Sequence, residues 1–243
     1  MYYRRFVPLV MAIIFVLVGL GFASAKSVPA GKDQRRLESI EPLDLAVLIQ
    51  DDLVSQVSNE LGVTREFIRS LPSGSRVMVG YITAGSLQVR QPFTSDLDQA
   101  ARSLRIPLSS VSSAPYNPYV EVLEALKKFQ DKGGNEKAVL LISDGLDISR
   151  GFDSTAAGHT LDLQRAIKEA HRRNVSVFSF YAPSVGLTSH SHLAASYGQS
   201  SLNRLADETG GKAFFQGITG FVTFDSYFRQ LRETLNRQYA KAA

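Results

Sequence analysis

The sequence predicts a doubly wound α/β sandwich, in which helices cover both faces of a mostly parallel sheet. Three features predict it: short apolar runs that suit buried strands, segments of helical spacing between those runs, and a single hairpin. Strands that alternate with helices form parallel units, whereas the hairpin adds one antiparallel edge strand. The 243 residues suffice for one such domain and an N-terminal extension.

The composition is that of a folded protein without a nucleic-acid partner. Hydrophobic residues make up 44% and charged residues 21% of the chain, which is typical of a globular domain. The net charge is +4, and removing Arg4 and Arg5, which precede the domain, leaves the domain near +2. So small an excess of positive charge does not indicate a nucleic-acid-binding surface. The absence of cysteine excludes disulfides, thiolate metal ligands and a cysteine nucleophile.

The N-terminus has the three parts of a secretory signal. Arg4 and Arg5 form a basic start, residues 6–22 are almost wholly apolar, and Ala23-Ser24-Ala25 offers the small residues that signal peptidase needs. We therefore predict that residues 1–25 are a signal peptide and that the protein is exported, to the periplasm or outside the cell. The alternative is a membrane anchor at residues 6–22, because this run approaches the ~20 residues that span a bilayer.

The domain is expected to span residues 43–243, after a flexible tether at 26–42 that mixes charges with two prolines. Its strands are apolar or alternating segments, expected at 43–49, 77–81, 87–91, 138–142, 175–181 and 212–215. Its helices repeat apolar residues every three or four positions, and they are expected at 54–71, 95–104, 118–129, 163–174, 193–209 and 223–235.

Turn and cap residues bound these elements. Residues 83–86, with the sequence TAGS, join two strands into the hairpin. Pro72 ends the first helix, Asn174 ends the helix of residues 163–174, and Gly210 stops the next one. Thr223 is predicted to cap the last helix.

Acidic residues follow two of the predicted buried strands. Asp51 and Asp52 come directly after the first strand, and Asp144 follows the strand at 138–142. In an open parallel sheet, ligands bind beyond the carboxyl ends of the strands. If the two strands are neighbours, the carboxylates converge, and close like charges favour a bound cation or a protonated partner.

The order of these motifs resembles the von Willebrand factor type A domain, in particular its bacterial exported branch. The resemblance rests on LDLAVLIQDD, AVLLISDG, VSVFSFYAP and LNRLADETGGKAFFQ, and it covers nearly everything from residue 43 to residue 239. It implies a Rossmann-like sandwich with strand order 3-2-1-4-5-6. It also implies a metal-ion-dependent adhesion site, made of Asp-x-Ser-x-Ser after the first strand, a Thr before the third helix, and an Asp after the fourth strand.

Only part of that metal-site pattern is present. Counted from Asp51, the two serine positions hold Leu53 and Ser55, so that one hydroxyl ligand is lost. Residues 109–118 contain no threonine, which leaves the oxygens of Ser112, Ser113 or Asn117 as substitutes. The resemblance therefore implies a degenerate site of Asp51, Ser55 and Asp144, which would hold Mg²⁺ or another divalent cation weakly.

Two further features concern the same edge of the sheet. His190 and His192, together with an acid, offer ligands that suit zinc, although a polar surface loop is the favoured interpretation. Residues 183–200 are predicted to be a long loop and a contact surface. Aromatic anchors are expected there and in the neighbouring loop, unless the rings pack beneath their own loops; these are Tyr116, Tyr119 and Tyr197.

The predicted function is that of a non-enzymatic binding module, which bridges to an acidic side chain of a protein partner through the cation. The chain has no nucleophile elbow, Walker A loop, dinucleotide fingerprint or zincin motif. No sequence motif therefore supports nucleophilic, nucleotide-dependent or zincin-type catalysis. One alternative is a metal-dependent hydrolase that uses Asp51, Asp144 and the His190/His192 segment. Another is a metal-free structural scaffold of the envelope. A membrane is expected as a partner only if the N-terminal segment is retained.

Overall fold

The computed structural model describes residues 41–130, 134–151, 160–216 and 222–240. The predicted signal peptide and nearly all of the predicted tether lie outside these residues. Within the described part of the chain, no helix is both long enough and apolar enough to cross a membrane.

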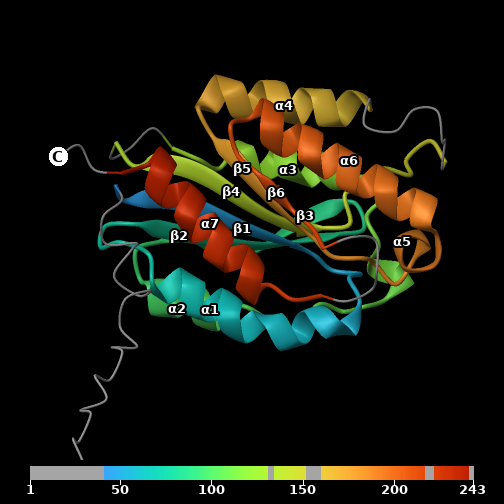
Figure 1. Cartoon of the computed structure of the whole chain (residues 1–243), viewed down its shortest axis with the longest axis horizontal. Helices are drawn as coiled ribbons and strands as arrows, with labels where there is room; N and C mark the ends of the chain where they lie inside the picture. The colour runs from blue at the N-terminus through green and yellow to red at the C-terminus, as the bar shows by residue number, and fades with distance from the viewer. Residues whose placement is uncertain (1–40, 131–133, 152–159, 217–221, 241–243) are drawn as a thin grey trace, which may run out of the picture. The chain divides into compact units, whose positions relative to one another are not determined.

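A six-stranded sheet forms the centre of the domain, in the order β3-β2-β1-β4-β5-β6 (Figure 1). Among the strands of the described residues, only β2 and β3 pair antiparallel, which confirms the predicted hairpin edge. The strands are β1 (Leu43–Gln50), β2 (Arg76–Thr83), β3 (Ser86–Thr94), β4 (Glu136–Ser143), β5 (Ser176–Tyr181) and β6 (Ala213–Phe214). The fold class and the strand order are therefore as predicted.

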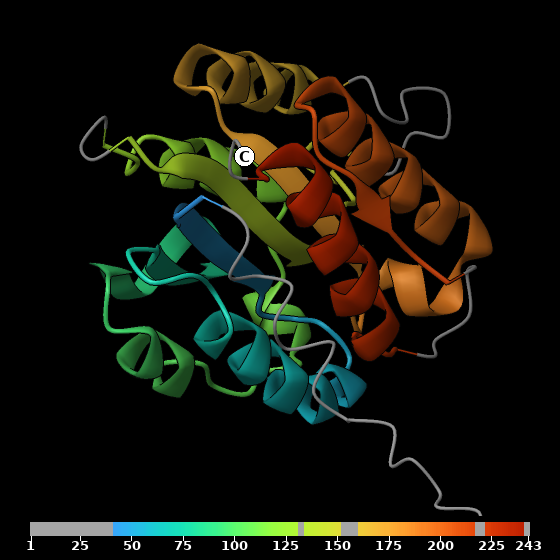
Figure 2. The ribbon, with the colours of Figure 1, turned by 60° about the vertical axis from the view of Figure 1, so that its left-hand side comes forward.

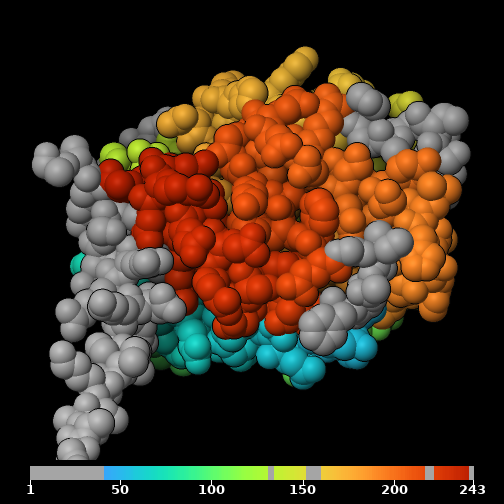
Figure 3. Space-filling model, in the orientation of Figure 1, coloured from blue at the N-terminus to red at the C-terminus, as the bar shows by residue number. Residues whose placement is uncertain are grey.

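Helices cover both faces of this sheet (Figure 2). Those of the described chain are α1 (Leu61–Arg69), α2 (Leu97–Arg102), α3 (Pro118–Leu126), α4 (Leu161–Arg173), α5 (Leu187–His190), α6 (His192–Glu208) and α7 (Asp225–Gln238), with short 3-10 helices at Ser55–Glu60 and Val111–Ser113. The two-residue β6 lies between α6 and α7, whose surfaces adjoin in Figure 3. These helices cover the short edge strand.

The alternation of side chains along β1 divides the core into two layers. Leu45, Val47 and Ile49 pack with α1, α2 and α7, whereas Ala46 and Leu48 pack with α3, α4 and α6. All of these side chains are buried, as the continuous apolar run of a central parallel strand predicts. The same period of two decides which way the polar residues after β1 point.

Three details differ from the sequence predictions. The predicted loop at 183–200 is wrong over most of its length, because α5 and the first half of α6 occupy it. Thr223 does not cap the last helix: Phe224 is the N-cap residue, and no side chain caps it by a hydrogen bond. Tyr119 is fully buried, so it is a core residue and no surface anchor.

Candidate functional site at the carboxyl ends of the strands

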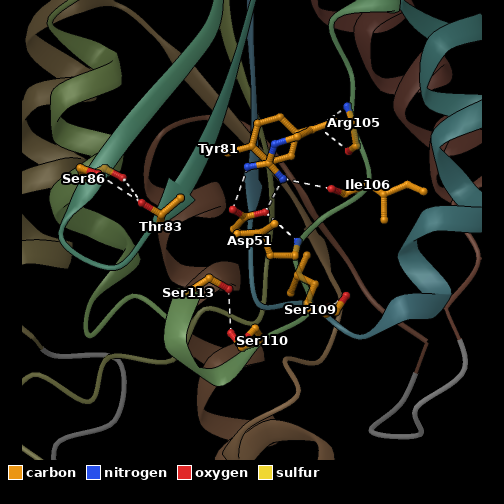
Figure 4. Close-up of polar contacts among 11 residues, drawn as sticks. Asp51, Tyr81, Thr83, Ser86, Arg105, Ile106, Ser109, Ser110 and Ser113 are labelled. Atoms are coloured by element: carbon orange, nitrogen blue, oxygen red, sulfur yellow. Dashed lines mark hydrogen bonds and ion pairs between the residues drawn. The ribbon is translucent and has the colours of Figure 1, made fainter.

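Asp51 directly follows β1, and its buried side chain forms an ion pair with Arg105 (Figure 4). The guanidinium makes two contacts, from Nη1 to Oδ1 at 2.6 Å and from Nη2 to Oδ2 at 2.8 Å. The backbone N–H of Leu108 donates a third hydrogen bond to Oδ1, at 3.0 Å. Both oxygens of this carboxylate are thus held by donors of the chain itself, and its charge is neutralised.

Tyr81 of β2 positions Arg105 in this pair. The guanidinium carbon lies 3.9 Å from the centre of the tyrosine ring, a cation–π contact. The phenol donates to the Arg105 carbonyl at 2.6 Å and accepts from the Arg105 N–H at 2.8 Å. Tyr81 is opposite Ile49 in the register of β1 and β2, so the period of two places the Asp51 side chain on the same face of the sheet.

Asp52 and Asp144 share a different donor, the side-chain amide of Gln50. Its Nε2 donates to Asp52 Oδ1 at 2.8 Å and to Asp144 Oδ1 at 3.1 Å. Its Oε1 accepts from the hydroxyl of Ser143 and from the N–H of Asp144. One amide therefore connects the carboxyl end of β1 to that of β4.

Thr188 of α5 completes the surroundings of Asp144. Its hydroxyl donates to Asp144 Oδ2 at 3.1 Å, and the Leu146 N–H donates to Oδ1 at 3.1 Å. The turn is packed tightly against α6, because Gly145 has a φ of +69° and lies directly beside Gly198. The position of Asp144 is therefore determined by β4, α5 and α6 together.

The two acids that share Gln50 hold their protons unusually well. Burial and, to a smaller extent, the nearby charge of Asp144 together raise the pKa of Asp52 to about 7, against the hydrogen bond from Gln50. Burial likewise raises the pKa of the Asp144 carboxyl, against the hydrogen bonds that it accepts. Protonation of one carboxyl of this pair relieves the repulsion between Asp52 and Asp144 that was expected at this edge.

The three predicted metal ligands do not form one site in this arrangement. Asp51 and Asp144 follow neighbouring strands, as expected, but the first contacts Arg105 and the second contacts Gln50 and Thr188. Ser55 is exposed at the start of a 3-10 helix. A magnesium ion takes oxygen ligands at about 2.1 Å in octahedral geometry, so it would have to displace these donors. The residues present therefore do not fit a divalent ion as they stand.

The substitute oxygens are also engaged elsewhere. The side-chain oxygen of Asn117 caps α3 by accepting from the Tyr119 N–H, and its amide donates to Asp162. The Ser113 hydroxyl donates to the carbonyl of Ser110, whose own hydroxyl pairs with that of Ser112. The serine side chains stabilise their own loop, and Asn117 connects that loop to α4.

The two histidines considered as zinc ligands lie at the surface. His190 and His192 are both exposed. In the residues that the structure describes, no three histidine, aspartate or glutamate side chains are grouped so that they could hold a metal ion.

Exposed apolar side chains gather at this same edge. In the described chain nine large apolar residues are exposed, and each lies either between α2 and α3, in the first turn of a helix, or directly after β6. All of these positions belong to the carboxyl-end edge of the sheet. We call them the apolar rim: Ile106, Leu108, Val111, Tyr116, Val120, Leu161, Leu187, Leu193 and Phe215.

Sequence reasoning missed the residues that satisfy the acids, namely Gln50, Arg105 and Thr188. One feature of the sequence could have pointed to Gln50. It is a polar residue at the end of an otherwise apolar run that is typical of a buried strand, and a buried polar group needs a partner. Arg105 and Thr188 carried none, because they lie 54 and 44 residues from the carboxylates that they contact.

Comparison with solved structures gives the same fold. An aerotolerance-related membrane protein from Bacteroides fragilis matches with a TM-score of 0.55 and 14% identity, over 82% of this chain and 100% of that chain. BatB from Bacteroides thetaiotaomicron matches with a TM-score of 0.52 and 15% identity, over 81% of this chain and 98% of that chain. The VWA domain of SpRpn10 matches with a TM-score of 0.48 and 10% identity, over 82% and 96% of the two chains.

No protein-family model matches the sequence, and neither does any curated protein. At identities this low, the structural likeness shows the fold alone. Together with the strand order, it confirms the predicted doubly wound α/β sandwich.

Proposed function

We propose that this chain is an exported, non-enzymatic protein-binding module, and that it binds its partner through the carboxyl-end edge of the sheet. The observation that carries the proposal is the apolar rim. Single exposed apolar residues are ordinary on a protein surface, but their concentration on one edge is typical of an interaction site. Four of them lie within eleven residues, and each of these four side chains is more than 60% exposed: Ile106, Leu108, Val111 and Tyr116.

The segment that carries these residues is held in place before any partner arrives. The Ser109 N–H donates to the Asp51 carbonyl at 2.9 Å, and the Ser109 hydroxyl donates to the Leu53 carbonyl at 2.7 Å. A loop that is already ordered loses less conformational entropy on binding than a flexible one. This order supports recognition by docking onto a preformed surface.

The two alternative functions have less support. A metal-dependent hydrolase needs its histidines near the acids, and His190 and His192 are exposed instead. A metal-free scaffold is favoured by one observation, the hydrogen bond from the Leu146 N–H to Asp144. A scaffold, however, gives no reason for the apolar rim. In a metal-bridged module, a cation would take part of its coordination from the partner, and binding would then require a divalent ion.

The test is crosslinking from a defined position followed by a measured affinity. A photoreactive residue at position 108 should capture one partner in the compartment to which the protein is exported. The same residue at position 130 should not, because Gln130 is exposed at the opposite edge of the domain, after α3 and before β4.

The captured partner, purified, should then bind the wild type and lose at least tenfold in affinity for an Ile106→Ser, Leu108→Ser variant. Gln130→Ser serves as the control and should bind like the wild type. Equal affinity of the rim variant and the wild type would remove the rim from the binding function. Binding that a chelator abolishes would establish the metal-bridged form.

A further inference from the structure

We infer that the Arg105 guanidinium compensates the buried charge of Asp51 without a divalent cation, and that this pair holds the segment of Ile106, Leu108 and Ser109 in place. The inference deepens the proposed docking function. Only the purpose of the ordered segment depends on that function; the metal-free ion pair does not. Its physical basis is the two-point ion pair between Arg105 and Asp51.

A buried carboxylate requires a compensating charge, and Asp51 is fully buried. Either a metal ion or a basic side chain can provide that charge. The planar guanidinium matches the two oxygens of a carboxylate. Arg105 provides this match from within the chain, so the compensation does not depend on the concentration of an ion.

The ion pair also determines the path of the loop. Beyond Asp51, Nη1 of Arg105 donates to the carbonyl of the next residue, Ile106, at 3.0 Å. Asp51 in turn accepts the N–H of Leu108 with its side chain and the N–H of Ser109 with its carbonyl. Tyr81 holds the backbone of Arg105 through its hydroxyl group. The backbone of the loop from Arg105 to Ser109 is thus held mainly by contacts with Asp51 and Arg105.

The other acids at this edge are satisfied in a similar way. The Gln50 amide lies between Asp52 and Asp144 and donates one hydrogen bond to each. Thr188 and the Leu146 N–H provide the remaining donors to Asp144. Donors of the chain itself therefore satisfy the carboxylates of Asp52 and Asp144.

The test compares the wild type with Arg105→Met, which removes the charge at similar length, and Arg105→Lys, which keeps the charge without the two-point contact. Hydrogen exchange at the amides of Leu108 and Ser109 reports the loop directly. Their exchange should be at least tenfold faster in Arg105→Met and intermediate in Arg105→Lys. The Ile148 amide, which bonds to the Tyr116 carbonyl at 2.8 Å, should exchange as in the wild type.

Thermal melting with chelator and with millimolar magnesium or manganese completes the experiment. The wild type should melt at the same temperature in all three conditions. A metal-dependent rise of several degrees in the wild type would overturn the inference. So would unchanged exchange at Leu108 and Ser109 in a folded Arg105→Met variant.

If Arg105→Met does not fold, Arg105→Lys and Asp51→Asn provide the same comparison. Unchanged exchange at Leu108 and Ser109 in both would again overturn the inference. None of these measurements needs a partner, so they can succeed even if the crosslinking experiment disproves the docking function. Conversely, loss of affinity in the rim variant would support docking even if the wild type proved to bind metal.

Discussion

Gly198 of α6 packs so closely against Asp144 that a Cβ at this position would lie 1.9 Å from the Asp144 carbonyl oxygen. No real Cβ approaches a backbone oxygen to that distance, so only glycine allows α6 to contact the turn that carries Asp144. The geometry of the acid site and the packing of α6 are therefore linked.

Gly198→Ala should destabilise the domain by about 2 kcal/mol or more, because backbone must move to relieve the contact. Gly62→Ala is the matched control, since a Cβ there meets nothing within 4 Å and alanine favours the helix by about 0.5–1 kcal/mol. Chemical denaturation of the two variants should show changes of opposite sign. A stable Gly198→Ala variant would mean that α6 lies farther from the turn.

Stability should fall as the pH rises from about 4 to about 7. The pKa of Asp52 is about 7 in the folded domain against 3.8 in the unfolded chain, so the unfolded chain releases its proton first. The stabilisation by the bound proton is complete below pH 3.8 and is lost as the pH passes 7. Asp144, whose pKa is also raised, contributes with the same sign.

Asp52→Asn should remove the part of this loss that comes from Asp52, and its advantage over the wild type should grow with pH to at most about 4 kcal/mol above pH 7. Denaturant unfolding at pH 5, 6, 7 and 8 measures the slope. Asp98→Asn, at an exposed carboxylate, should retain the slope of the wild type. An Asp52→Asn variant with the wild-type slope would assign the pH dependence to other groups.

Leu48→Asp and Leu140→Asp should each unfold the domain. Both side chains are fully buried, on the paired central strands β1 and β4. An unpaired buried charge costs several kcal/mol, against a total stability of about 5–15 kcal/mol.

Circular dichroism of each variant tests this expectation. Leu161→Asp is the control, because this half-exposed residue begins α4, where a negative charge is favourable. A native melting profile for Leu48→Asp would contradict the burial of β1 on both faces.

The exported protein should begin at or near Lys26. The prediction rests on the basic start, the apolar run and the small residues at 23–25. Mass spectrometry of the N-terminal peptide checks it. Recovery of Met1 in a membrane fraction would instead establish an anchor at residues 6–22.

Residues close together in the chain were enough to predict the elements whose signals are local. The apolar run at 43–49 predicted a buried central strand, and Leu43–Gln50 forms one. Asn174 predicted a helix end, and it adopts the left-handed conformation that ends α4. These predictions succeeded because periodicity and turn chemistry depend on residues close together in the chain. The position of Asp144 after β4 was predictable for the same reason.

The roles of the acids depend on contacts between segments that are far apart in the chain. A metal ion or any basic side chain of the domain could have compensated the charge of Asp51. Arg105, which lies 54 residues away in the sequence, compensates it. Thr188 meets Asp144 across 44 residues, after α5 forms where a loop was predicted. Such pairs depend on how strands and helices cross, and side-chain periodicity carries no information about that crossing. The fold could therefore be predicted from the order of the residues. The contacts of the acids at the carboxyl-end edge of the sheet could not, because they form only when distant segments pack together.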